Sequence, residues 1–243
     1  MSAGIYKGRG VVLSTVKYGD SSMVAQLLTD CGGRQSFMVQ GIRSSRGKGS
    51  KLALFQPLFA LEFEGVQPTR GELHRFREVH NGITLRQTPF DVRRSTIALF
   101  VAEVLYRLIK ESEANERLFD FVWGSIEALD TIDEGVANFH LWFLSNLSSI
   151  LGFSPMGSYS KGAYFDFAEG SYTTTKPHHN NYLEPANATI LRDMIECDVR
   201  HLGEIGLNRQ QRVSFLESLM SYYAFHLESI RSVQSIAILM EVF

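Results

Sequence analysis

The sequence contains only two cysteines, Cys31 and Cys197. Two cysteines are too few for a disulfide framework and cannot form a thiolate zinc site alone, so we expect both to be reduced in a cytoplasmic protein. No stretch reaches the roughly 18 continuous apolar residues that a membrane span requires. The N-terminal residues have no long apolar run before their first charges, so we expect neither a signal peptide nor a membrane partner.

The short motifs of common enzyme classes are also absent, since there is no P-loop, GxGxxG, HExxH or GxSxG pattern. Carboxylate pairs such as Asp91 with Glu103 and Glu111 with Glu113 fall on predicted helix surfaces, where a solvated charge is the simpler interpretation. We therefore expect no catalytic residues, no enzymatic activity and no cofactor.

Charge is distributed unevenly, although the whole chain carries only −2. Residues 1–80 hold eleven Lys/Arg and six Asp/Glu, a balance of +5, whereas residues 81–243 hold thirteen and twenty, a balance of −7. This asymmetry indicates a basic N-terminal module that meets a polyanion, joined to an acidic body.

The first 80 residues are interrupted by turn residues about every 8–12 positions, and the intervals are rich in Val, Leu, Phe and Thr. This pattern predicts five strands, at 9–18, 22–29, 34–40, 54–65 and 72–79. Turns at 19–21 and 30–33 contain glycines, which supply the positive-φ positions of tight hairpins. Five strands are enough for a small closed barrel. Pro57 favours an edge or a bulge within the fourth strand.

After Pro89 the apolar period changes from two to 3.6, which predicts helices. We expect them at 90–110, 116–130, 135–151, 188–197, 208–228 and about 229–242. Asn115, Asn187 and Asn208 are predicted N-caps, and Gly152 is a predicted helix terminator.

The residues at about 153–186 lack helical spacing and predict an irregular insertion, with a short hairpin around 163–174. The predicted fold class is therefore α+β, with a five-stranded OB-type β-barrel domain at 1–80 and an α-helical domain at 81–243 that carries the insertion.

The segment GIRSSRGKGSK at 41–51 contains four basic residues, three glycines and no acid. It lies in the predicted loop between the third and fourth strands, and no acid occurs between Arg34 and Glu62 to neutralise it. A flexible basic loop can follow a sugar–phosphate backbone, where each neutralised phosphate releases counterions. We predict a nucleic-acid-binding surface in this loop with a basic extension from the strands, formed by Arg43, Arg46, Lys48 and Lys51 together with Lys7, Arg9 and Arg34.

A simpler interpretation of the basic segment stays open: it is a solvated turn that only keeps the protein soluble. The aromatic residues near it also have two interpretations. Tyr6, Tyr18 and Phe37 could stack on bases, but an aromatic residue in a strand belongs to the core more often than to a binding surface.

Several short features follow one another in an order that is informative. They are Val12-Leu13, Tyr18-Gly19-Asp20-Ser21-Ser22, Thr29, Gly32 or Gly33, Gln40-Gly41-Ile42-Arg43, Gln56-Pro57, VAEVLYRLIKESEANERLFDFV at 101–122, FLSNLSSILGFSP at 143–155 and RSVQSIAILMEVF at 231–243. In this order and spacing, over nearly the whole chain, the sequence resembles the RecO family of bacterial recombination mediators. No single motif is specific to that family.

The resemblance implies an N-terminal OB domain and a role in DNA repair and recombination. It implies that the protein binds single-stranded DNA, remodels the single-strand-binding protein, promotes strand annealing and allows recombinase loading with a RecR-like partner. It also implies a bacterial cytoplasmic protein that associates with the nucleoid.

Two features depart from the family pattern. Many members carry a CxxC…CxxC zinc module after the Gly-Phe-x-Pro element, but the insertion contains no cysteine, so we predict no metal; adjacent His178 and His179 project apart and lack further ligands. The family is also expected to hold the acidic, Phe-ended tail of the single-strand-binding protein in a basic and apolar groove of the helical domain. Because no Lys or Arg occurs between Arg117 and Lys161, such a groove would have to use Arg93, Arg94, Arg107, Lys110 or Arg117.

We predict from these observations a non-enzymatic recombination mediator. Two other functions stay open: a protein–protein adaptor with little DNA affinity, and an OB-fold RNA-binding factor.

Overall fold

A computed structural model describes the chain except for residues 1–3, 42–50, 69–70, 72 and 111–112. The chain divides into two compact units, each described separately below. The first unit comprises Met1–Phe90 and Ala98–Asp130, and the second comprises Asp91–Ile97 and Thr131–Phe243. The predicted domain boundary at residue 80 stays a prediction. No helix in the described part of the chain is long and apolar enough to cross a membrane.

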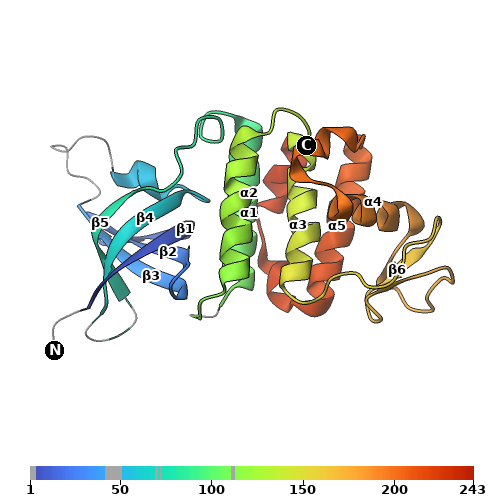
Figure 1. The fold of residues 1–243 in the computed structure, drawn as a ribbon, viewed down its shortest axis with the longest axis horizontal. Coiled ribbons are helices and arrows are strands. Elements are labelled where there is room, and N and C mark those ends of the chain that lie inside the picture. Colours follow the sequence, from blue (N-terminus) through green and yellow to red (C-terminus); the bar gives the residue numbers. More distant parts are fainter. Residues whose placement is uncertain (1–3, 42–50, 69–70, 72, 111–112) are drawn as a thin grey trace. The chain divides into compact units, whose positions relative to one another are not determined.

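The first unit contains a closed barrel of five strands in the order β1-β2-β3-β5-β4 (Figure 1). The strands are β1 (Ile5–Tyr18), β2 (Ser22–Thr29), β3 (Gly33–Gln40), β4 (Ala60–Val66) and β5 (Leu73–Asn81). β1 pairs with β4 through its first half and with β2 through its second half, and its register shifts between Val12 and Ser14. Such a bulge bends a strand, which allows one strand to serve both sides of the barrel. Parallel pairing of β3 with β5 closes the sheet, and the predicted OB-type barrel is confirmed.

The barrel core follows the alternation of the strands. Ala25 and Leu27 on β2 and Phe37 on β3 are fully buried, and the rings of Phe37 and Phe76 stack with centroids 4.4 Å apart. The predicted hairpin turns are also confirmed, because Gly33 has φ 58° and Gly19 has φ 67°.

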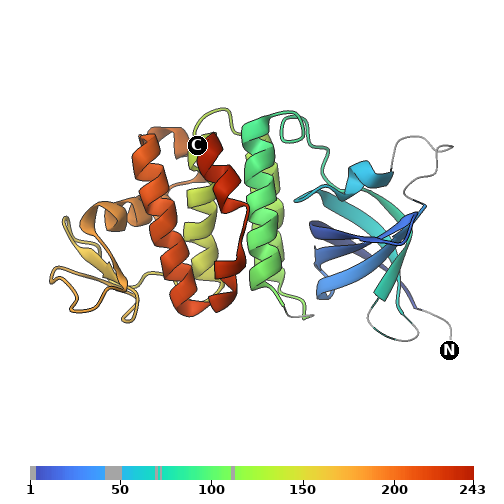
Figure 2. The same cartoon turned by 180° about the vertical axis from the view of Figure 1, so that it is seen from behind.

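The fourth predicted strand is wrong over residues 54–59. A 3-10 helix, η1 (Lys51–Phe55), occupies its start and lies at one end of the barrel (Figure 2). Phe55 is only 3% exposed and joins the barrel core. Pro57 has no N–H for a strand ladder, and Leu58 has φ 65°, so the chain turns here before β4 begins.

Two helices follow the barrel, α1 (Val92–Leu108) and α2 (Glu116–Thr131). Asn115 caps α2 as predicted, since its Oδ1 accepts a hydrogen bond of 3.0 Å from the backbone N–H of Leu118. Near the end of α2, Asp130 is 5% exposed and accepts hydrogen bonds from the backbone N–H groups of Arg86, Gln87 and Thr88. This carboxylate therefore fixes the segment that leads from β5 to α1.

The second unit is mainly helical. Its helices are η2 (Val136–Asn138), α3 (Phe139–Ile150), α4 (Pro185–Glu196), η3 (Val199–Glu204), α5 (Arg209–His226), η4 (Glu228–Ser232) and α6 (Ile236–Val242). Asn208 caps α5 as predicted and forms a capping box with Gln211. Asn187 is not a cap, because α4 already begins at Pro185 and the Asn187 side chain donates to Ser218 Oγ at 2.7 Å.

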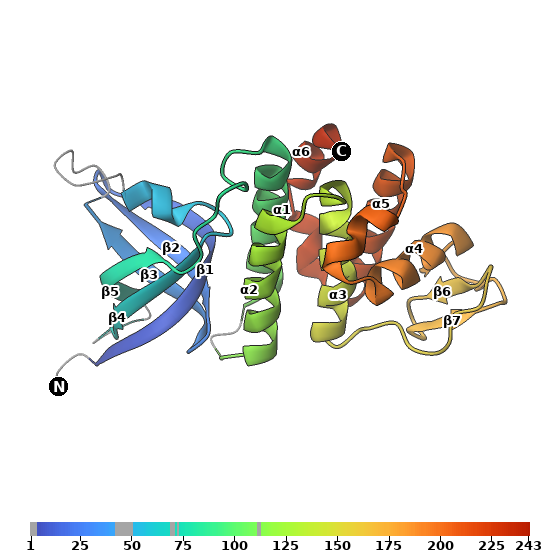
Figure 3. The same ribbon diagram turned by 45° about the horizontal axis from the view of Figure 1, so that its top comes forward.

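The insertion between α3 and α4 forms a small sheet beside α4 (Figure 3). Its strands are β6 (Tyr164–Asp166), β7 (Ser171–Thr173) and β8 (Tyr182–Leu183), in the order β7-β6-β8. The predicted hairpin around 163–174 is confirmed by the pairing of β6 with β7, whereas β8 lay outside the prediction.

Candidate nucleic-acid interface

The centre of the predicted basic surface falls largely outside the described residues. Arg43, Arg46 and Lys48 belong to the omitted range 42–50, and the side chain of Lys51 is omitted as well. The start of the segment is described: the Gly41 N–H donates to the Ser21 carbonyl at 3.0 Å. The basic segment therefore leaves the barrel beside the turn between β1 and β2.

Lys7 lies on the half of β1 that pairs with β4, and this side of the barrel is acidic. Its Nζ is 3.7 Å from Glu64 Oε1, and Lys7 and Glu64 are register partners. A shallow hollow here brings together Lys7, Arg9, Asp30, Glu62, Glu64, Glu78 and His80. With four carboxylates in one hollow, this side attracts a polyanion poorly.

Arg9 contacts other parts of its own unit. Its Nε donates to Asp30 Oδ2 at 3.1 Å, and Nη2 is 3.8 Å from Asp120 Oδ1 on α2. The guanidinium also lies over the rings of Phe119 and Trp123, at 5.0 and 5.2 Å from their centroids. These contacts connect the barrel to α2.

Arg34 makes a similar connection to α1. Its Nη1 donates to the Tyr106 carbonyl at 3.1 Å, and the guanidinium lies 5.3 Å from the centroid of the Tyr106 ring. The structure thus does not bring Lys7, Arg9 and Arg34 into one exposed basic patch. Their assignment as nucleic-acid ligands stays a prediction.

The three aromatic residues of the sequence prediction have different surroundings. Phe37 is fully buried, and the half-buried Tyr6 forms a 2.6 Å hydrogen bond with His74 Nδ1. Burial and, to a lesser degree, Cys31 raise the pKa of Tyr6, and burial lowers the pKa of His74. Both side chains are therefore neutral near pH 7. Only Tyr18 among the three is exposed, at 60%.

The other half of the barrel surface has a different character, which the sequence prediction missed. No Asp or Glu occurs in β1, β2 or β3. Val16, Val24 and Met38 are register neighbours on β1, β2 and β3, and Met38 also pairs with Arg75 on β5. We call this row, together with Tyr18, the acid-free face. The alternation of residues in β2 and β3 could have shown it, but only once the register was known.

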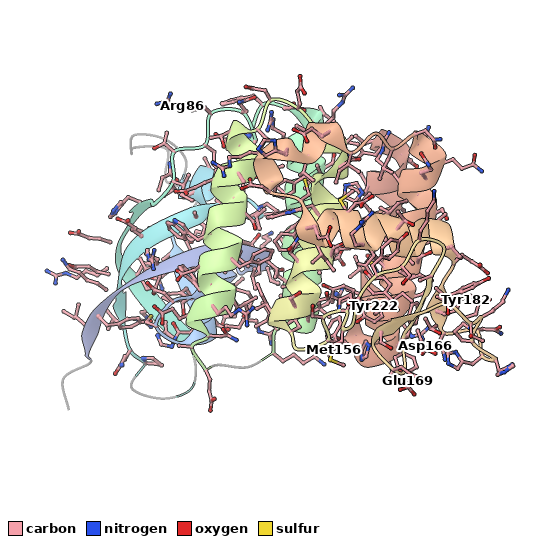
Figure 4. All side chains as sticks on the ribbon, turned by 45° about the vertical axis from the view of Figure 1, so that its right-hand side comes forward. Arg86, Met156, Asp166, Glu169, Tyr182 and Tyr222 are labelled. Atoms are coloured by element: carbon pink, nitrogen blue, oxygen red, sulfur yellow. The ribbon has the colours of Figure 1, made fainter. Side chains whose placement is uncertain are left out.

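The insertion lacks the cysteines of the zinc module that the resemblance in sequence led us to look for. His179 Nε2 is 3.2 Å from Asp166 Oδ2, and Asp166 Oδ1 accepts from the backbone N–H groups of Ala168 and Glu169. Figure 4 labels Met156, Asp166, Glu169 and Tyr182 of the insertion, and Tyr222 of α5. Within the described ranges, no group of three or more His, Cys, Asp or Glu side chains could hold a metal ion.

The insertion packs against α5 through apolar contacts. Phe165 is fully buried, and its ring centroid lies 5.2 Å from that of Tyr222. The Tyr222 hydroxyl donates to the Phe153 carbonyl, where the insertion begins. These contacts bury the apolar face of β6 against α5.

Two of the five basic residues considered for a partner groove contact other parts of the chain. Arg94 is buried and donates to the Ile132 carbonyl at 2.6 Å, and Arg107 is 3.4 Å from Glu103. Arg93, Lys110 and Arg117 are exposed.

A groove of about 600 Å³ lies instead between the insertion, α5, η4 and α6 of the second unit. Its wall is mostly apolar, and its polar residues include one cation, Arg231. Its lining consists of Phe167, Asn180, Asn181, Met220, Ser221, Ala224, Phe225, Ile230, Arg231, Val233 and Ile236. Phe225 is 43% exposed, so the groove presents apolar surface to solvent.

Comparison with known proteins covers nearly the whole chain. Residues 1–81 match the family model "Recombination protein O N terminal", and residues 89–233 match "Recombination protein O C terminal". The DNA repair protein RecO of Bacteroides fragilis is 36% identical over 241 residues, which cover 98% of this chain and 99% of the relative. The proteins of that name from Phocaeicola vulgatus and Flavobacterium psychrophilum are 33% and 32% identical; the matches cover 98% of this chain and 99% and 98% of the relatives.

Proposed function

The chain belongs to the recombination protein O family, and from this membership we propose that it is a DNA repair and recombination mediator. It binds single-stranded DNA, remodels the single-strand-binding protein, promotes annealing of complementary strands and supports recombinase loading with a RecR-like partner. It breaks no bond and acts by positioning its partners, in the bacterial cytoplasm at the nucleoid.

The observation that carries this proposal is the match of both family models to the chain, in order. Three features support DNA binding in particular. The first unit contains a closed five-stranded barrel, a fold that other proteins use to bind oligonucleotides. The segment at 41–51 has four basic residues and no acid, and β1 to β3 contain none either.

A salt titration tests the DNA-binding step. Fluorescence anisotropy with a labelled single-stranded oligonucleotide is expected to show affinity that falls steeply with salt, because bound phosphates release counterions. Changing Arg43, Arg46 and Lys48 together to Ala should remove about three phosphate contacts and reduce the slope of log K against log salt by about 2. Changing Lys161 to Ala is the control, because it removes a positive charge at an exposed site outside the predicted nucleic-acid-binding residues.

The same assay separates the two alternative functions. An adaptor would bind a protein partner tightly and show absent or salt-independent oligonucleotide binding. An RNA-binding factor would retain RNA in competition with a DNA oligonucleotide of the same sequence, because only RNA offers the 2′-hydroxyl.

We propose that the groove in the second unit receives the tail of the single-strand-binding protein. The apolar wall around Phe225 suits a terminal phenylalanine, and Arg231 suits an acidic chain or its carboxylate. A peptide with the sequence of that tail should bind at least about 10-fold more weakly to Arg231→Glu. Lys161→Glu, which makes the same charge change at another exposed site of this unit, should leave peptide binding unchanged. Equal effects of the two variants would argue for a non-specific charge effect.

A further inference from the structure

Three arginines of the second unit, Arg93, Arg209 and Arg212, form what we call the arginine cluster. Arg209 and Arg212 are the first and fourth residues of α5, and Arg93 lies in the first turn of α1, in the part of that helix that belongs to this unit. Arg93 and Arg209 are exposed, and Arg212 is half-buried. Burial and, to a smaller degree, the charges of Arg209 and Arg93 lower the pKa of Arg212, so the three charges lie near one another.

No acid of the described residues forms an ion pair with the cluster. Three other arginines of the same unit differ in this respect, because each lies 2.6–3.6 Å from a carboxylate: Arg94, Arg192 and Arg200. Asp91, the acid next to α1, accepts from the backbone N–H of Arg93, but its other oxygen is directed to Arg94. The positive charge of the cluster is therefore left without a countercharge from the described part of the chain.

Two hydrogen bonds to backbone carbonyls hold the cluster in position. Arg209 Nη2 donates to the Met240 carbonyl at 2.8 Å, and Arg212 Nη1 donates to the Leu207 carbonyl. Arg212 Nε is buried and has no hydrogen-bond partner among the described residues. Each guanidinium has five N–H donors, so one bond apiece leaves donors on the exposed Arg209 that can reach a ligand.

The place of Arg209 and Arg212 on α5 is unfavourable for the helix itself. The N-terminus of a helix carries about half a positive charge, which stabilises anions and destabilises cations in the first turn. The first turn of α5 contains no acidic residue. Two cations at this end, with Arg93 nearby, therefore reduce the stability of the second unit, and a bound anion would restore it.

We propose that the arginine cluster binds a phosphomonoester, which is the terminal phosphate of a free nucleotide or of a DNA strand. Arg93 and Arg209 contact its oxygens from the solvent side, and Arg212 adds positive charge from its half-buried position. This site belongs to the second unit and goes beyond the proposed function, since it depends neither on the barrel nor on the groove around Arg231.

A phosphomonoester fits the cluster in both charge and donor arrangement. It carries about −1.5 to −2 charges at pH 7 and has three strongly accepting oxygens. The planar fork of a guanidinium binds such oxygens in pairs. A carboxylate or a phosphodiester has a single charge and two free oxygens, so it would neutralise less of the cluster. Because two of the three arginines share one helical turn, the charge is also concentrated rather than extended along a track.

Isothermal titration calorimetry with thymidine 5′-monophosphate and with thymidine tests the site directly. We expect the monophosphate to bind at least about 10-fold more tightly than the nucleoside. Arg93→Gln and Arg209→Gln should each weaken binding of the monophosphate by about 10-fold or more. Arg200→Gln is the matched control, because it removes an exposed arginine of the same unit that is paired with Asp198, and it should change the affinity by less than about 2-fold.

Two oligothymidines, one with a 5′-phosphate and one with a 5′-hydroxyl, identify the source of the phosphate. If the ligand is the end of a DNA strand, the phosphorylated form should bind more tightly to the unchanged protein and equally to Arg93→Gln. If the ligand is a free nucleotide, the two strands should bind alike while the monophosphate still binds. Circular dichroism and thermal unfolding would show that the variants retain the fold.

Three results would overturn the inference and leave the proposed function standing. In the first, neither the nucleoside nor the strand gains affinity from a terminal phosphate. In the second, Arg200→Gln weakens binding as much as Arg93→Gln, which indicates a non-specific charge effect. In the third, Arg93→Gln weakens both oligothymidines by the same factor, so that the cluster contacts phosphodiesters of the backbone instead.

Discussion

Replacing Asp130 should destabilise the first unit more than any surface charge change. The Asp130 carboxylate is 5% exposed and accepts three backbone hydrogen bonds, from Arg86 at 2.8 Å, Gln87 at 3.0 Å and Thr88 at 2.7 Å. Asp130→Ala leaves these N–H groups without their acceptor, and Thr88 is itself only 4% exposed. Each hydrogen bond to a charged group contributes about 1.5–3 kcal/mol, but relaxation and the desolvation of the carboxylate reduce the sum. We expect a net loss of about 2–4 kcal/mol.

Asp130→Asn is the informative control. Its Oδ1 can still accept from Gln87 and Thr88, whereas its amide faces the Arg86 N–H as a second donor. We expect a loss of about 1–2 kcal/mol, clearly smaller than for Ala.

Urea unfolding followed by fluorescence would measure these losses. In a Trp142→Phe background, Trp123 on α2 reports the first unit alone, because Trp142 lies on α3. Equal midpoints for the unchanged protein and Asp130→Ala, or equal losses for Ala and Asn, would refute the role given to this carboxylate.

The pH dependence gives a second check on Asp130. Burial raises its pKa, but the three backbone N–H donors outweigh burial, so the net pKa lies below the usual value. A lowered pKa in the folded state means that the stabilisation is complete above about pH 4 and is lost as the pH falls through the folded value. The stability difference between the unchanged protein and Asp130→Asn should therefore be constant from pH 7 to 5 and narrow below pH 4.

Three further predictions follow from other parts of the structure. Arg9→Ala should destabilise the first unit by about 1 kcal/mol in urea unfolding, because it removes the contacts with Asp30, Asp120 and two aromatic rings. Burial, with a smaller effect of Arg212, lowers the pKa of His140 to about 3. The free energy of unfolding should therefore be highest above about pH 6.5 and fall by about 1.4 kcal/mol per pH unit as the pH decreases toward 3. In thermal unfolding at pH 7.5 and 4.5, His140→Phe should reduce this pH dependence, whereas a variant at the exposed His201 should not. Treatment with EDTA should leave the midpoint temperature of unfolding unchanged, and a decrease would contradict the prediction that the insertion holds no metal. Asp166→Ala should lower the midpoint temperature by several degrees, because two backbone N–H groups lose their acceptor.

The elements that the sequence predicted best are those set by local interactions. β2 and the Asn115 and Asn208 caps follow from turn glycines, alternation and side-chain oxygens within a few residues. The errors arise where contacts between residues far apart in the sequence determine the local structure. Phe55 leaves the predicted strand because the barrel interior buries it, and Asn187 contacts Ser218 across two helices instead of capping α4.

The candidate site was harder to predict, because the strand register decides which basic side chain lies opposite a carboxylate of the neighbouring strand. Lys7 and Arg9 look like part of a basic surface in sequence, since no carboxylate is adjacent to either. Pairing of β1 with β4 places Glu64 opposite Lys7 and Glu62 opposite Arg9. The acid-free face is equally invisible without the pairing of Val24 with Val16 and Met38.

The strand order of the barrel also affects how the chain folds during synthesis. β1 is made first but needs β4 as a neighbour, and β3 needs β5, which is made last. The sheet therefore cannot close on the ribosome until β5 has emerged, and until then the β1–β3 meander exposes Leu27 and Phe37 to solvent. Arg9 and Asp130 can act only later still, after α2 has been translated. Folding of the barrel during synthesis therefore waits for its last strand, and the apolar residues of the first three strands stay unburied until then.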